Sequence, residues 1–138
     1  MPRKTDSSNP ADWLFIAESD LEGIETLAKG EIAYSMCRSK LAEVLEKIIK
    51  AELIRLGWYL IKTHDLERLR GELEALKSDL VGQVDPLCGA LTEVYFTDRY
   101  PGFDVEDPDW PDFNAKLEQV KQLFRDVKYR VASGGSRS

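Results

Sequence analysis

The chain has 138 residues, 43% of them apolar and 32% charged, a balance that excludes a disordered or collagen-like chain and favours a single domain. Nineteen basic side chains against twenty-five acidic ones give a formal charge of −6. The chain therefore lacks the overall positive field that non-specific nucleic-acid binding uses, and we do not expect nucleic acid as a partner.

Neither a membrane helix nor a signal peptide is predicted, because no apolar run approaches the ~18 residues of a membrane span and the first residues are polar. The two cysteines, Cys37 and Cys88, match no zinc or redox spacing and lie in apolar helical patterns, which favours the reduced cytoplasm. We expect a flexible N-terminus over residues 1–9, a helical domain over 10–132 and a flexible tail over 133–138.

The first two predicted helices have clear boundary signals. Asn9 before Pro10 is typical of a helix start, and an apolar stripe then continues to a stop at Gly30. The second helix is predicted from Ile32 to Leu56, with a stop at Gly57. Its apolar stripe is wider than a surface helix needs, so this helix is expected at the centre of the bundle.

Three further helices complete the predicted all-α, five-helix, up-and-down bundle. Thr63 is the expected cap of the third, whose leucine seam ends at Gly82, and Asp85–Pro86 is the expected start of the fourth. A loop with three prolines and six acids follows over residues 98–112, and the fifth helix is predicted to begin near Asp112. No segment shows the alternation of a strand. The apolar run 58–61 is expected against the first or last helix, or in a dimer contact.

The residue types present exclude several kinds of active site. The sequence has no glycine-rich phosphate loop, and His64 is its only histidine, which excludes a two-histidine site within one chain. No nucleophile elbow surrounds a serine, and no acid stands three residues before His64 as a di-iron bundle would need. We expect no metal and no cofactor, because the carboxylates of the acidic loop are typical of solvated side chains.

Five fragments, taken in order, resemble the HEPN domain family. They are Glu46–Ala51, Gly57, Lys62–Leu66, Tyr95 and Asp98–Pro101. The resemblance covers roughly residues 13–131 and implies an up-and-down helical bundle with a short extra helix. It also implies a homodimer, a nucleotide ligand and a partner nucleotidyltransferase, since many prokaryotic members are encoded beside one and act with it as toxin and antitoxin.

The chain departs from the ribonuclease members of that family. These carry an arginine, four to six residues and then a histidine, so that the arginine polarises a phosphate while the histidine moves protons. With His64 as the histidine, the arginine would have to stand at Gly57, Trp58 or Tyr59. We therefore expect no catalytic residue and a non-catalytic module. Two alternatives stay open: a ribonuclease toxin using Arg99 with His64 of the other subunit, and a structural adaptor without a ligand.

The candidate ligand-binding residues are polar side chains near the resembling fragments. Three of them share one face of the second helix, and the rest lie around the start of the third helix or in the acidic loop; together they are Lys40, Lys47, Lys50, Lys62, His64, Asp65, Arg99 and Tyr100. Lysines and an arginine at these positions would receive a nucleotide phosphate. Each also has a structural interpretation: a solvated face for the lysines, a loop contact for His64, and an ion pair within the acidic loop for Arg99.

Overall fold

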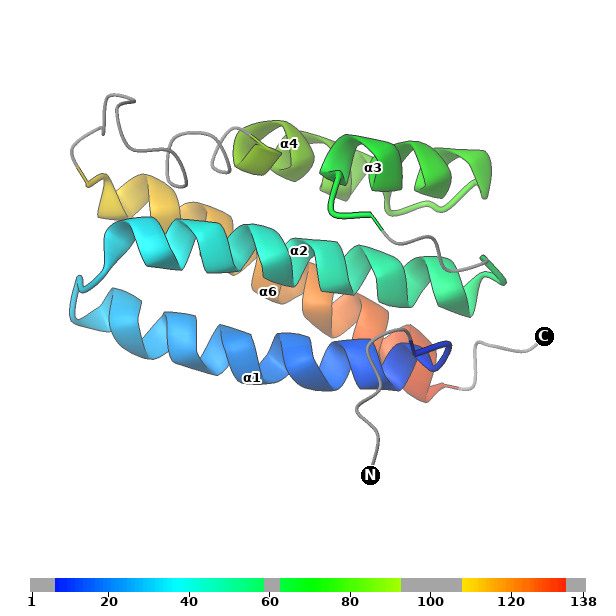
Figure 1. Cartoon of the computed structure of the whole chain (residues 1–138), viewed down its shortest axis with the longest axis horizontal. Helices are drawn as coiled ribbons and strands as arrows, with labels where there is room; N and C mark the ends of the chain where they lie inside the picture. The colour runs from blue at the N-terminus through cyan, green and yellow to red at the C-terminus, as the bar shows by residue number, and fades with distance from the viewer. Residues whose placement is uncertain (1–6, 59–62, 93–107, 134–138) are drawn as a thin grey trace.

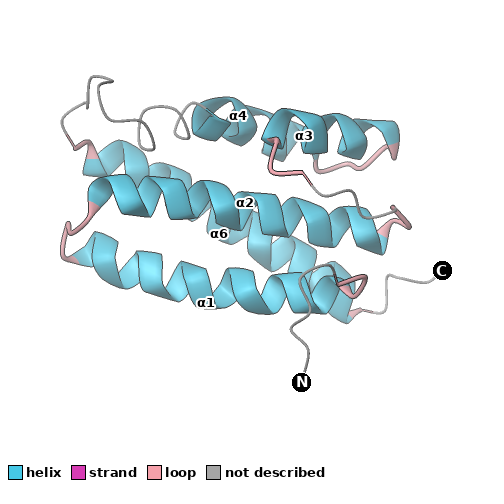
Figure 2. Cartoon of the chain, viewed as in Figure 1, coloured by secondary structure: helices cyan, strands magenta, loops and turns pink. Residues whose placement is uncertain are grey.

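The computed structural model describes residues 7–58, 63–92 and 108–133, and these residues form helices and connecting turns only. The five helices are α1 (Pro10–Lys29), α2 (Tyr34–Arg55), α3 (Leu66–Ala75), α4 (Val81–Thr92) and α6 (Trp110–Ala132). The described residues contain no strand (Figure 2), so the prediction of an all-α, five-helix bundle is confirmed.

The helices pack in two layers around α2. Helices α1 and α2 run side by side, α6 crosses behind them, and the shorter pair α3 and α4 covers the other side of α2 (Figure 1). Helix α2 contacts each of the other four. Most of its middle is buried, with Leu41, Val44, Leu45 and Ile48 fully inaccessible. The wide apolar stripe of this helix therefore did predict its central place.

The boundaries of α1 follow the predicted signals. Asn9 Oδ1 accepts a hydrogen bond from the Ala11 amide at 3.0 Å, and Pro10 occupies the first turn, where no amide bond is lost. The helix ends at Gly30, as predicted.

Helix α2 begins later than predicted, at Tyr34 rather than Ile32. Glu31 and Ala33 both have a positive φ, 54° and 58°, in the turn after α1. An α-helix cannot include this left-handed backbone, so α2 starts only after it. The stop at Gly57 is as predicted, because the glycine takes a φ of 92° directly after the helix.

The third and fourth helices were divided at the wrong place. The cap of α3 is Asp65 rather than Thr63, since Asp65 Oδ1 accepts from the Glu67 amide at 3.0 Å. Helix α3 ends at Ala75, before the left-handed residue Lys77. Ser78 Oγ then accepts from the Leu80 amide at 3.1 Å, just before α4 begins. The leucines continue at helical spacing through this serine turn, so the apolar pattern does not indicate that one helix ends and another begins here.

Helix α4 therefore includes Gly82, the expected end of the third helix, and Pro86, the expected start of the fourth. Gly82 lies in its first turn, and Pro86 lies inside it instead of opening it. Proline at the sixth position forgoes only the bond to the carbonyl of Gly82, four residues earlier. Val94 and Tyr95, expected in the same helix, lie outside the described residues.

Helix α6 begins at Trp110, two residues before its predicted start. Asp109 Oδ1 accepts from the Asp112 amide at 3.1 Å, and Pro111 occupies the first turn. The earlier start buries the Trp110 ring, which meets Tyr34 edge-on at a centroid distance of 5.1 Å. Phe113 joins them at 5.6 Å from Trp110, so three aromatic rings tie α6 to the start of α2.

Other expectations fall partly outside the described residues. Both chain ends do so over residues 1–6 and 134–138, as does the apolar run over 59–61. The described member of that run, Trp58, is partly buried and donates from Nε1 to Glu72 of α3 at 3.0 Å. In the three described stretches, no helix has the length and apolar character to cross a membrane.

Both cysteines are free and buried. Burial raises the pKa of the Cys88 thiol to about 12, so this sulfur behaves as a core side chain rather than as a nucleophile.

Candidate functional site

Two of the predicted ligand residues meet at a buried carboxylate of α2. Lys50 Nζ donates to Glu46 Oε2 at 2.9 Å, and His64 Nδ1 lies 2.9 Å from the same oxygen. The Glu46 and Lys50 side chains are 7% and 5% exposed, whereas His64 is 84% exposed. The histidine ring thus ties the segment before α3 to α2 and leaves its outer edge to solvent.

An aromatic ring from α1 covers the lysine of this cluster. Lys50 Nζ lies 5.1 Å from the centroid of the Trp13 ring, within the range of a cation–π contact. Trp13 is held in turn by a 2.8 Å bond from its Nε1 to the Ser7 carbonyl. We call Trp13, Glu46, Lys50 and His64 the Glu46 cluster. The predicted ligand residues include Lys50 and His64 but not Glu46, the residue that joins them.

The other two lysines of the predicted set are also paired with carboxylates. Lys40 Nζ lies 3.2 Å from Glu43, and Lys47 Nζ lies 3.9 Å from Glu43 and 3.7 Å from Asp20 of α1. Lys40 and Lys47 thus have Glu43 as a common partner, whereas Lys50 is buried against Glu46. The surface with Lys40 and Lys47 alternates in charge and is not a bare basic patch, so an incoming phosphate would have to compete with these carboxylates.

The remaining predicted residues do not join the Glu46 cluster in the described structure. Asp65 uses its carboxylate to cap α3, accepting from the amides of Glu67 and Arg68 at 3.0 and 3.3 Å. Lys62, Arg99 and Tyr100 lie outside the described residues. Among the residues the structure does describe, no three histidine, cysteine or acidic side chains gather as a metal site.

A second charged cluster, absent from the sequence-based set, lies at the last turn of α2, two residues beyond Lys50 in the sequence. Glu52 is 1% exposed, and its carboxylate accepts from Arg55 at 2.8 and 2.9 Å. Arg130 of α6 donates to the same group at 3.1 Å, and Ser78 Oγ lies 3.3 Å away. Arg130 also holds Asp79 through two bonds of 2.8 and 3.1 Å. We call these residues the Glu52 cluster.

The Glu52 cluster joins α2, the α3–α4 turn and α6 through charge-assisted bonds. The bonds from Arg130 are the main reason that the pKa of Asp79 is lowered, and the same contact raises the pKa of Arg130. The hydrogen bonds that Arg55 donates to Glu52 likewise raise the pKa of Arg55. The sequence did carry one signal for this cluster. Glu52 stands within the apolar stripe of α2, and a buried charge must find partners.

A family model for the HEPN domain matches residues 10–131 of the chain. The chain belongs to the HEPN domain family. The match spans all five described helices and confirms the family inferred from the sequence fragments. In the searches of curated proteins and of solved structures, nothing matches the chain.

Within this HEPN domain, His64 has no arginine before it with four to six residues between them, so the ribonuclease motif is incomplete. Gly57 and Trp58 end the turn after α2, and Tyr59 follows. The nearest described partner of His64 is a carboxylate that already binds a lysine. An acidic partner can orient an imidazole, but it supplies no positive charge to a phosphate.

Proposed function

We propose that this HEPN domain is a non-catalytic binding module: a homodimer that holds a partner protein, a small nucleotidyltransferase, in a toxin–antitoxin-like pair. The observation that carries the proposal is the pairing of the described candidate cations with carboxylates of the same chain. Lys40, Lys47 and Lys50 each have an acidic partner within 4 Å. A helical surface of alternating charge suits a protein partner better than a polyphosphate, because both signs can be matched across an interface.

The missing ribonuclease motif supports the non-catalytic part of the proposal. We expect purified protein to leave single-stranded and hairpin RNA intact, and His64→Ala to be indistinguishable from the unchanged protein in a gel-based cleavage assay. The assay should run at the protein concentration where the homodimer forms, so that a site shared between subunits is also tested. Cleavage that disappears in His64→Ala would establish the ribonuclease alternative instead.

Two measurements distinguish binding of a nucleotidyltransferase from binding of a nucleotide. We expect affinity capture from the source cells to retain a nucleotidyltransferase, identified by mass spectrometry, and ATP to leave the Tm unchanged. A ligand that binds only the native state must raise the Tm, so ATP binding would be visible in the same assay.

Nucleotide binding is the second candidate function, favoured by the ring of Trp13 beside Lys50 and by the exposed edge of His64. It would be indicated by a rise in Tm with ATP that His64→Ala abolishes, together with capture of no nucleotidyltransferase. The matched control is Lys29→Ala, which removes an exposed cation at the opposite end of α1 from Trp13.

A further inference from the structure

The seam between α1 and α6 is crossed by two ion pairs seven residues apart on each helix. Lys121 Nζ lies 2.6 Å from Glu25, and Lys128 Nζ lies 3.2 Å from Glu18. Seven residues are close to two turns, so the pairs stack along the same side of two antiparallel helices. The two ion pairs connect α1 and α6 at these two levels.

At the next level along this seam, the described residues form no such pair. Seven residues before Glu18, α1 carries Ala11, whose short side chain leaves the space open. A hollow of about 280 Å³ lies there, with Leu14, Phe124, Val131 and Ala132 in its walls. We call it the α1–α6 groove. Its walls are apolar apart from Glu18 and Lys128 at one edge.

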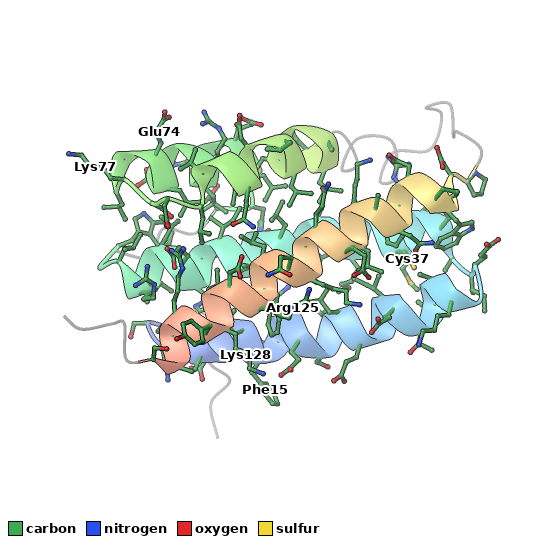
Figure 3. The ribbon with its side chains drawn as sticks, turned by 180° about the vertical axis from the view of Figure 1, so that it is seen from behind. Phe15, Cys37, Glu74, Lys77, Arg125 and Lys128 are labelled. Carbon is green, nitrogen blue, oxygen red and sulfur yellow. The ribbon has the colours of Figure 1, made fainter. Side chains whose placement is uncertain are left out.

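Phe15 lies at the rim of the α1–α6 groove and points into solvent. Its side chain is 74% exposed and extends away from α1 beside Lys128 (Figure 3). Ile16 follows it at 45% exposure. One small surface thus carries an exposed aromatic ring and, next to it, an apolar hollow of a size that accepts a ring.

We propose that the α1–α6 groove is the homodimer interface and that Phe15 of each subunit inserts into the groove of the other. A two-fold axis brings the same patch of both copies together, so a patch that carries both a projection and a hollow is complementary to itself. This inference rests on the proposed homodimer and adds where the subunits meet.

Charge supports a second copy as the occupant. Glu18 and Lys128 remain 45% and 53% exposed at the groove edge, so a two-fold related copy can set each opposite the other sign. The chain carries a net charge of −6, which opposes self-association over most of its surface. At this seam, however, two lysines balance two glutamates, so these four side chains add no net negative charge beside the apolar patch.

Sedimentation velocity over a range of concentrations tests the inference. We expect a dimer for the unchanged protein and a dissociation constant raised by roughly 100-fold or more for Phe15→Ala, because the two-fold dimer contains the contact twice. Ala11→Leu, which narrows the groove and keeps Phe15, should also weaken the dimer. Thermal unfolding at low concentration should show all variants folded alike, since Phe15 and Ala11 are exposed.

Two control variants keep the test specific. Tyr129→Ala removes a ring that is also 74% exposed but does not line the groove, and Met36→Ala alters a separate hollow of about 190 Å³ between α1 and α2. Both should remain dimeric. A dimer that survives Phe15→Ala, or that only Met36→Ala dissociates, would overturn the groove as the interface while the homodimer stands. A monomer at every concentration would overturn the homodimer too.

Discussion

Replacing Glu52 with glutamine is expected to lower the free energy of unfolding by about 3 kcal/mol, which corresponds to a Tm roughly 10 °C lower for a domain of this size. The carboxylate is 1% exposed and neutralises Arg55 and Arg130, whose side chains are only 14% and 26% exposed. Glutamine fits the same space but leaves two guanidinium groups facing each other without the charge that separates them.

The control for this variant is Asp79→Asn, which alters the other partner of Arg130. Asp79 is 76% exposed, so solvent screens its pair, and the expected loss is at most about 1 kcal/mol. Both are measured by urea unfolding followed by far-ultraviolet circular dichroism. Equal losses for the two variants would contradict the assignment of Glu52 as the centre of the cluster.

Lys50→Met is expected to cost about 3 kcal/mol, because it leaves the Glu46 carboxylate buried with an exposed histidine as its one remaining partner among the described residues. The double variant Glu46→Leu with Lys50→Met should recover most of this loss, since a well-packed apolar pair removes both desolvation penalties. The two substitutions are therefore expected to be strongly non-additive in urea unfolding.

Lys47→Met is the matched control on the same helix. Lys47 and Glu43 share the i,i+4 spacing of Lys50 and Glu46, but their side chains are 19% and 33% exposed. An exposed pair of this kind contributes about 0.3–0.5 kcal/mol. If Lys47→Met and Lys50→Met lower the stability equally, burial does not govern the difference between the two pairs.

Local signals account for much of what could be predicted. The cap at Asn9, the stop at Gly57 and the breadth of the apolar stripe on α2 are properties of a few neighbouring residues, and the structure has all three as expected. The division of α3 from α4 failed because leucines continue at helical spacing through a turn. Ser78 and the left-handed Lys77 divide the helices there, and the apolar pattern does not register either.

For the candidate site, the sequence placed Lys50 and His64 among the polar residues of interest without showing that they meet. Their common partner Glu46 is four residues from Lys50 but eighteen from His64, so only the fold brings all three together. The Glu52 cluster is even harder to predict from the sequence, because Arg130 is separated from Glu52 by 78 positions.

The amino-acid sequence by itself determined the all-helical class, the central role of α2 and the absence of an arginine at the ribonuclease spacing, since each depends on residue types at short separations. The tertiary structure alone decided which charges are buried and paired, and it alone placed Phe15 beside an apolar groove. Burial is set by the elements that pack over a residue, and those come from distant parts of the chain.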